Sequence, residues 1–377
     1  REYVAYAKTV GFWLSLLAAI ALVVQLLFSR PGVPALRTLV SWAIGAVLGV
    51  FGAFLAAGVV GPAIVVAVIN ASIRGTVPIA LGSLSGIFSE RSSIVNIGIE
   101  GMMLMSAYVG FMINVFLSGS SVPPALQAEP VRLGLSISGG VLAGGLLGLM
   151  HATLSVRFTV DQIISGTVIN ILAIGLTGFL YVPGATTLGR LPPVIANPFR
   201  QSDELLFWLG EIAFNKGVIT YLMVALVFMV TLALFRTAWG LRTRAIGEHP
   251  RAADTLGINV HRMQYLNLFF SGCMAGLGGV FLTLEAVGTF ERGMTNGRGF
   301  IALAVMIFGK WHPLGAAAGA LLFGFATALQ GQLQFFNINI PHQFVGMLPY
   351  LLTVIVLAGF VGRARPPAHV GKPYEVE

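Results

Sequence analysis

The sequence predicts an all-α fold, a polytopic membrane helix bundle of about ten or eleven transmembrane helices, some of them short or broken. Of the 377 residues, 56% are hydrophobic and only 10% are charged, whereas a soluble domain carries roughly 25% charged residues. Apolar runs of about 20 residues, the length that a helix needs to cross the hydrocarbon, recur throughout. We therefore expect a single transmembrane domain over residues 1–377.

The first part of the chain contains two long apolar runs and a short one. Thr9–Phe28 is longer, at about 20 residues, than the hydrophobic region of a signal peptide, and no Ala-x-Ala site follows it. We therefore expect Phe12–Phe28 to be a retained span, with residues 1–38 forming an extra N-terminal span and its linker. Leu39–Ile73 is too long for one crossing and is expected to divide near Gly58–Pro62. Val77–Phe88 is expected to be a short segment, because a proline and two glycines interrupt it.

Further apolar runs follow along the rest of the chain. Those predicted to be helices are Ile94–Phe116, Leu133–Leu154, Ile163–Tyr181, Val218–Phe235, Tyr265–Val287, Phe300–Phe308, Leu314–Gln330 and Val345–Val361. A long outer loop, 182–217, includes the amphipathic piece Glu204–Phe214. The tail, 362–377, carries two arginines and several prolines, and is expected to be cytoplasmic and loose.

Two features of the runs bear on their packing and role. Glycines four residues apart, such as Gly140, Gly144 and Gly148, predict close contact between helix backbones. Val77–Phe88 and Phe300–Phe308 are short segments in corresponding halves of the chain. Such segments mark the central pathway of a transporter, although ordinary short spans would give the same pattern.

A hydrophilic insert, 236–264, separates two apolar runs in the second half of the chain. It carries five of the 22 Lys and Arg residues and two of the 14 acids. Lipid cannot hold such a segment, and its Lys/Arg excess places it in the cytoplasm. Its middle is predicted to be a short helix, about Pro250 to Leu256, because Pro250 suits a first helical position and Gly257 a stop.

Three ordered stretches resemble the permeases of ABC importers. Ala252-Ala253-x-x-x-Gly257 is similar to their Glu-Ala-Ala-x-x-x-Gly motif, with Arg251 in place of the Glu. Ser89–Met105 and Gly297–Gly315 resemble two further motifs. The chain is therefore identified as a suspected member of the sugar/nucleoside (branched-chain amino acid-type) importer superfamily, most similar to nucleoside permeases.

The resemblance implies a function and a set of partners. The chain would form the pathway for nucleosides, or for simple sugars as the alternative, in the bacterial plasma (inner) membrane. A second permease subunit, often non-identical, two cytoplasmic ATPase subunits and an extracellular substrate-binding protein or lipoprotein would accompany it. The loop 236–264 would couple it to the ATPase, through Glu248, Pro250, Arg251, Ala252, Ala253 and Gly257.

Several classes of function lack support in the residues. No Gly-x-x-x-x-Gly-Lys-Ser/Thr segment occurs, so ATP and Mg are expected on partner subunits, with no cofactor and no enzymatic activity in this chain. The single cysteine and unpaired histidines argue against a metal site. The net charge of +8 is explained by cytoplasmic loops rather than by nucleic acid. A secondary transporter or channel without an ATPase is the remaining alternative.

A few polar residues inside or beside the spans are candidates for the pathway. Glu100 is the most informative, because a buried charge in a membrane is costly. It either neutralises Arg91 or a helix N-terminus, or lines the pathway. Further pathway candidates are Asn96, which also suits a cap or a structural hydrogen bond, and Thr167 and Asn170, which also suit bonds to neighbouring helices. Glu285 and Arg298 flank one loop and would contact substrate, the receptor or water.

Overall fold

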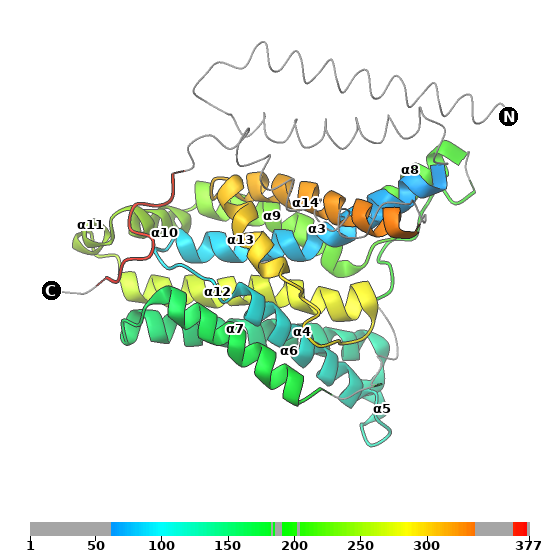
Figure 1. Cartoon of the computed structure of the whole chain (residues 1–377), viewed down its shortest axis with the longest axis horizontal. Helices are drawn as coiled ribbons and strands as arrows, with labels where there is room; N and C mark the ends of the chain where they lie inside the picture. Colours follow the sequence, from blue (N-terminus) through cyan, green and yellow to red (C-terminus); the bar gives the residue numbers. More distant parts are fainter. Residues whose placement is uncertain (1–61, 182–183, 185–190, 202–203, 336–364, 375–377) are drawn as a thin grey trace, which may run out of the picture. The chain divides into compact units, whose positions relative to one another are not determined.

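The computed structural model describes residues 62–181, 184, 191–201, 204–335 and 365–374. Within these ranges every regular element is a helix (Figure 1), which confirms the predicted all-α class. The chain divides into two compact units, one of residues 1–76, 193–216 and 317–364, the other of residues 77–192, 217–316 and 365–377. Helices α3 and α14 each run from one unit into the other.

Six helices of the described residues are long and apolar enough to cross a membrane. They are α3 (Pro62–Glu90), α4 (Ile99–Leu117), α6 (Glu129–Ala152) continued by η1 (Thr153–Arg157), α7 (Gln162–Phe179), α9 (Val218–Arg236) and α12 (Val260–Val280) continued by η2 (Phe281–Val287). Two apolar helices, α13 (Arg298–Phe308) and α14 (Pro313–Phe335), accompany them, and α5 (Pro124–Gln127) is one short turn. The protein is therefore a multi-pass membrane protein. The spans predicted at 12–28, in 39–61 and at 345–361 lie outside the described residues.

The prediction of a separate short segment at Val77–Phe88 is wrong, because these residues form the second half of the continuous 29-residue helix α3. Pro78 removes one backbone hydrogen bond without ending the helix, as membrane helices allow. Gly82 and Gly86 do not interrupt α3 but allow it to pack closely against α13. A Cβ placed at Gly82 would lie 2.8 Å from the Cβ of Ala302, so its absence lets α13 approach α3. Of the two predicted short segments only the second, α13, is short.

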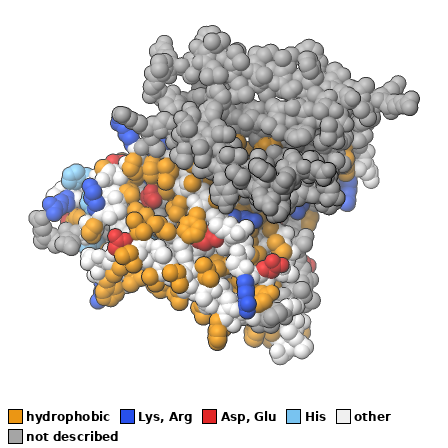
Figure 2. Space-filling model, in the orientation of Figure 1, with side chains coloured by type: hydrophobic (Ala, Val, Ile, Leu, Met, Phe, Trp, Pro, Cys, Tyr) orange, Lys and Arg blue, Asp and Glu red, His pale blue; other side chains and the backbone are white. Residues whose placement is uncertain are grey.

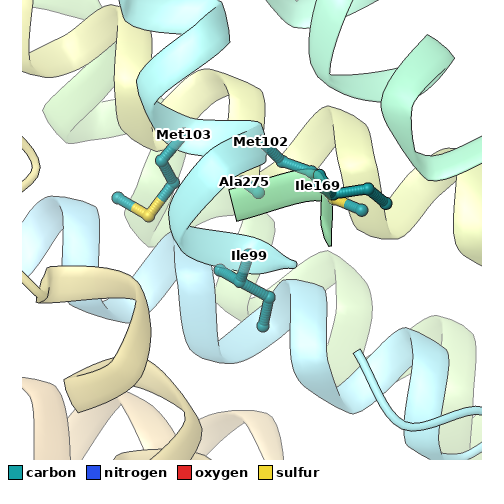
Figure 3. Close-up of a cluster of buried hydrophobic side chains, with 5 residues drawn as sticks. All are labelled: Ile99, Met102, Met103, Ile169 and Ala275. Atoms are coloured by element: carbon teal, nitrogen blue, oxygen red, sulfur yellow. The ribbon is translucent and has the colours of Figure 1, made fainter. Parts of the chain in front are cut away.

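The core of the second unit is formed where α4, α6, α7 and α12 meet. Helix α12 packs against α6 and α4, and α4 also packs against α7. Figure 3 shows one buried cluster of this core, in which α4 contributes three side chains, α7 one and α12 one. Its members are Ile99, Met102, Met103, Ile169 and Ala275. Most of these side chains are fully buried, so this apolar cluster fixes α4 between its neighbours.

Close backbone contact between α6 and its neighbours depends on the predicted glycines. A Cβ placed at Gly144 would lie 2.7 Å from Ser106 Oγ and 2.9 Å from the Cα of Gly276. Without side chains at these positions, backbone atoms of the helices meet directly, as in many membrane proteins. The predicted role of the spaced glycines in packing is confirmed.

The first unit contains the first part of α3, the helix α8 (Glu204–Ala213) and most of α14. A Cβ at Gly75 would lie 3.2 Å from the Cα of Gly324, so α3 and α14 also pack closely. Lys216 Nζ donates to Asn70 Oδ1 at 2.7 Å and to the carbonyl of Glu211 at 2.7 Å, which ties α8 to α3. Helix α8 matches the predicted amphipathic piece Glu204–Phe214.

Large apolar side chains cover much of the surface of the transmembrane helices (Figure 2). On α7, Ile164, Ile171 and Phe179 are 59%, 65% and 85% exposed. In a soluble protein such a surface would be a liability. In this protein it suits lipid or the apolar face of another membrane subunit.

The α6 packing generates a stability test with a control on the same helix. Gly144→Ala should destabilise the protein by about 1–3 kcal/mol, because the new methyl group meets backbone atoms in a filled core. Gly134, also on α6, has nothing within 4 Å of its added Cβ, so Gly134→Ala should be neutral or stabilise by up to about 1 kcal/mol. Thermal unfolding in detergent measures both variants. Equal midpoints for the two variants would contradict the packing described above.

Candidate functional site

The hydrophilic insert folds into two helices, α10 (Ala238–Glu248) and α11 (Pro250–Thr255). Pro250 occupies the first position of α11, and the His249 ring accepts the backbone N–H of Ala252 through Nδ1 at 3.3 Å. Gly257 has a φ of +79°, a left-handed conformation that suits glycine, and it follows Leu256, the C-cap of α11. The short helix predicted from Pro250 to about Leu256 is confirmed.

The predicted coupling residues lie on two different faces of the insert. Ala253 is only 2% exposed and packs with Ile246, Val260 and Met263. Pro250 is buried as well. The exposed members are Glu248, Arg251, Ala252 and Gly257. Any partner of α11 therefore meets the exposed residues, whereas the buried residues Pro250 and Ala253 seat the helix on α10 and α12.

The C-terminal segment packs against the insert, so the expectation of a loose tail is wrong for residues 365–374. His369 N donates to the carbonyl of Gly247 at 3.0 Å, and the Tyr374 hydroxyl donates to Asp254 Oδ2 at 2.9 Å. The only signal of this contact in the sequence is a weak one, an aromatic residue at the end of a proline-rich stretch.

A cluster of polar and aromatic side chains joins α3 to the turn before α14. Arg91, directly after α3, donates to the carbonyl of Trp311 from Nε at 3.3 Å and from Nη2 at 3.1 Å. Trp311 Nε1 donates in turn to Glu90 Oε2 at 2.6 Å. The end of α3 and the residue 309–312 turn are thereby held by side chains that the sequence reasoning did not select.

The same cluster extends to the insert through an aromatic ring of α9. Two guanidinium groups lie over the ring of Phe235, Arg91 at 5.8 Å and Arg244 of α10 at 5.1 Å, and the His312 ring stacks on it at 4.7 Å. Burial lowers the pKa of Arg91 below its ordinary value, an effect that the Glu248 carboxylate opposes and Arg244 reinforces. Burial and then Arg91 lower the pKa of His312. Helix α10 is thus in electrostatic contact with α3, α9 and the 309–312 turn.

Glu100, in the first turn of α4, binds the start of another helix. Its Oε1 accepts the backbone N–H of Gly297 at 2.8 Å and its Oε2 that of Gly299 at 2.6 Å, both at the N-terminus of α13. A carboxylate is favourable there, because it meets unpaired N–H groups and the positive end of the helix dipole. Of the roles open to Glu100, the structure therefore supports the neutralised helix N-terminus. A role in the pathway stays a prediction.

Asn170 and Asn96 fix the same end of α4. Asn170, on α7, donates from Nδ2 to the carbonyl of Ile97 at 3.0 Å and accepts the N–H of Gly101 through Oδ1 at 2.7 Å. Asn96 donates from Nδ2 to Ser271 Oγ on α12 at 3.0 Å. Both amides make the structural hydrogen bonds that were one of their predicted alternatives, and contact with substrate stays a prediction for both.

Thr167 is not part of this network. It lies on the exposed face of α7, and its hydroxyl donates to the carbonyl of Ile163 in its own helix at 2.8 Å. Thr167 is exposed, whereas Asn170, three positions further along α7, is buried. Within the described unit Thr167 therefore faces outward, and its predicted pathway role is not tested.

Glu285 binds the N-terminus of α9, as Glu100 binds the N-terminus of α13. Its Oε2 accepts the backbone N–H of Ile219 at 2.9 Å, and its Oε1 accepts the hydroxyl of Thr220, so the carboxylate covers the N-terminus of α9. Arg298 donates from Nη1 to the carbonyls of Met294 at 2.9 Å and Thr295 at 3.2 Å, within its own loop. Contacts of Glu285 and Arg298 with substrate or receptor stay predictions.

The described residues offer no group of three or more His, Cys, Asp or Glu side chains placed to hold a metal ion. Cys273 is a free, partly buried thiol on α12. The polar side chains of the described unit are instead arranged to join helix ends to one another.

The hydrogen bonds of Asn170 generate a second test. Asn170→Ala would leave the N–H of Gly101 and the carbonyl of Ile97 without their partner, which costs about 1–3 kcal/mol for a buried polar group. We expect a lower thermal midpoint in detergent and reduced transport. Thr167→Ala, on the exposed face of the same helix, should change stability by no more than about 0.5 kcal/mol. Equal effects of the two substitutions would show that Asn170 does not hold α4.

Comparisons with known proteins agree with the fold and with the motifs. Residues 68–357 match a family described as "Branched-chain amino acid transport system / permease component". The guanosine ABC transporter permease protein NupQ of Bacillus subtilis is 39% identical over 316 residues, 81% of this chain and 96% of that protein. The nucleoside ABC transporter permease protein NupC of Lactococcus lactis subsp. cremoris is 37% identical over 307 residues, 79% of this chain and 93% of that protein.

A putative glucose ABC transporter permease protein of Haloferax volcanii, TsgC13, is 31% identical over 311 residues, 77% of this chain and 90% of that protein. No solved structure matches. The family match covers well over half of the chain, and the relatives align over nearly their whole length. The chain therefore belongs to the family of branched-chain amino acid-type permease components, the transmembrane subunits of ABC importers.

Proposed function

We propose that this chain forms the translocation pathway for nucleosides in an ABC importer of the bacterial inner membrane, driven by ATP hydrolysis on partner subunits. The observation that carries the proposal is α11, a short helix with one buried and one exposed face in the insert that the Lys/Arg excess predicts to be cytoplasmic. The names of NupQ and NupC support nucleosides as the substrate class. The name of TsgC13 keeps simple sugars as the alternative.

The exposed face of α11 is where an ATPase subunit would bind. Ala252 is small and exposed, which permits close approach, and Arg251 beside it carries charge. Leu256, which directly follows the helix, is 80% exposed and would add apolar area to such a contact. On the opposite face, Ala253 and Pro250 are buried and would pass a displacement of α11 to α10 and α12.

A displacement of α10 would reach the transmembrane helices through the cluster around Phe235. Arg244 of α10 and Arg91 after α3 share that ring, and Arg91 holds the carbonyl of Trp311. From this turn the chain runs back through α13 to its N-terminus, which Glu100 binds to the start of α4. Movement caused by ATP binding and hydrolysis would thus arrive at α4 and α13 inside the membrane. Asn96, Glu100 and Asn170 remain our candidates for polar side chains beside the substrate route.

The partners of this proposal follow from the family. They are a second permease subunit in a heterodimer, two ATPase subunits that carry ATP and Mg, and an extracellular substrate-binding protein or lipoprotein. The apolar surface of α7 suits lipid or a second permease. This chain would hold no cofactor, bind no nucleic acid and catalyse no reaction itself.

The substrate class and the energy source can be tested together. Proteoliposomes containing the complete importer should take up labelled guanosine in preference to glucose, and uptake should stop without ATP inside. Preference for glucose would favour the sugar alternative. Undiminished uptake without ATP or ATPase subunits would favour a secondary transporter or channel.

The coupling role of α11 generates a third prediction. Ala252→Trp places a bulky side chain on the exposed face, so substrate-stimulated ATP hydrolysis should be lost while the chain still inserts into the membrane. Val160→Trp is the control, because Val160 is an exposed residue of the loop between η1 and α7. The ATPase activity of the reconstituted importer measures both variants. Stimulation that survives Ala252→Trp would exclude α11 as the docking helix.

A further inference from the structure

The segment Arg365–Tyr374 has a buried anchor at Tyr374, which is 9% exposed. The anchor packs into the cluster that seats α11, with Ile246, Ala253, Val260 and Met263. An aromatic ring is a large apolar group to bury. Tyr374 is therefore part of the apolar core of the insert 236–264.

Tyr374 joins the two sides of the turn that contains Gly257. Its hydroxyl donates to Asp254 Oδ2 of α11 at 2.9 Å. Its ring meets the His261 ring of α12 edge-on at 5.6 Å, and its carbonyl lies 3.4 Å from His261 Nε2. An added Cβ at Gly257 would have no atom within 4 Å, whereas the next residue, Ile258, packs against the cluster that seats α11. Tyr374 is thus a contact that fixes the orientation of α11 relative to α12.

The rest of the segment is held by backbone hydrogen bonds. Ala368 N donates to Glu248 Oε2 at 3.2 Å, and His369 N to the carbonyl of Gly247 at 3.0 Å. Gly371 N donates to the carbonyl of Ser93, in the stretch between α3 and α4, at 3.1 Å. The segment therefore crosses from the transmembrane core to α11.

The segment also brings positive charge beside α11. Burial lowers the pKa of His369, and the positive charges of Lys372, His249 and Arg251 lower it further, in that order. Lys372 N donates to the carbonyl of His369 at 3.2 Å, and His369 N donates to the carbonyl of Gly247 at 3.0 Å, so the backbone at Lys372 lies close to the end of α10. Lys372 and Arg251 are exposed. An acidic surface is the complement that such a basic group recognises.

We propose that α11 and residues 367–374 form one composite docking surface for the ATPase subunit. Tyr374 positions α11 within this surface. Lys372 adds to the positive charge of the surface, which binds an acidic rim on the ATPase. This inference rests on the proposed function. It adds that docking requires a segment more than a hundred residues beyond α11 in the chain. We choose the ATPase over anionic lipid because the basic group shares its surface with the exposed Ala252 face of the coupling helix.

The experiment uses the complete importer in proteoliposomes and titrates the ATPase subunits at low and high salt. Tyr374→Ala should reduce substrate-stimulated ATP hydrolysis by about tenfold or more, because loss of a buried ring unseats α11. Tyr374→Phe keeps the ring and should restore most of the stimulation. This rescue separates positioning by the ring from a general loss of folding.

The charge is tested at an exposed residue, where folding is not at risk. Lys372→Glu should raise the ATPase concentration for half-maximal activity by about twofold to fivefold at low salt, and the difference should shrink at high salt, because salt screens exposed charges. Arg157→Glu is the control, since Arg157 is an exposed arginine at the end of η1 and is not among the charges that act on His369. An equal effect of Arg157→Glu would overturn the specific role of Lys372.

Two further outcomes would overturn the inference. If Ala252→Trp abolishes stimulation while Tyr374→Ala and Lys372→Glu behave like the unmodified protein, the composite surface is wrong and the coupling role of α11 stands. If Lys372→Glu instead weakens binding to vesicles of anionic lipid without changing the ATPase titration, the basic group contacts lipid headgroups. Survival of stimulation in Ala252→Trp would count against the proposed function itself.

Discussion

Inside a membrane, the backbone N–H groups at the start of a helix have no water to bond, so protein atoms must meet them. The rest of this structure depends on how that constraint is satisfied at α13. Glu100 supplies both carboxylate oxygens to N–H groups of that helix and is itself only 6% exposed. Because of this contact, α4 and α13 begin side by side in the bundle. Glu285 at α9 satisfies the same requirement.

The close approach of helices gives these polar contacts their geometry. A Cβ at Gly299 would lie 2.6 Å from the backbone N and Cα of Glu100, so only glycine lets the two helix starts come this near. A Cβ at Gly101 would lie 2.8 Å from the Cα of Asn170. Glycine at such positions costs conformational freedom, but it places a carboxylate and an amide within bonding distance of backbone groups. The same close packing of helices therefore also brings the buried polar groups to their hydrogen-bond partners.

Local signals in the sequence were sufficient for the fold class, for most spans and for α11. Pro250 and Gly257 restrict the backbone directly, so the helix between them could be predicted without knowledge of its neighbours. Pro78 was misleading, because whether a proline ends a membrane helix depends on what packs around it. Partners distant in the chain were out of reach. Glu100 and Gly299 are 199 residues apart, and Asp254 and Tyr374 are 120 apart. The sequence identified Glu100 and Asn170 as notable but could not say which helix end each one binds.

The contact of Tyr374 with α11 has a consequence for biosynthesis. Tyr374 leaves the ribosome 120 residues after Asp254. Until it emerges, α11 lacks the ring that completes its hydrophobic seat, even though α10 and α12 are already made. A nascent or prematurely terminated permease would therefore present an α11 that is incompletely packed. A partner that binds this surface would meet its complete form only after Tyr374 has been synthesised.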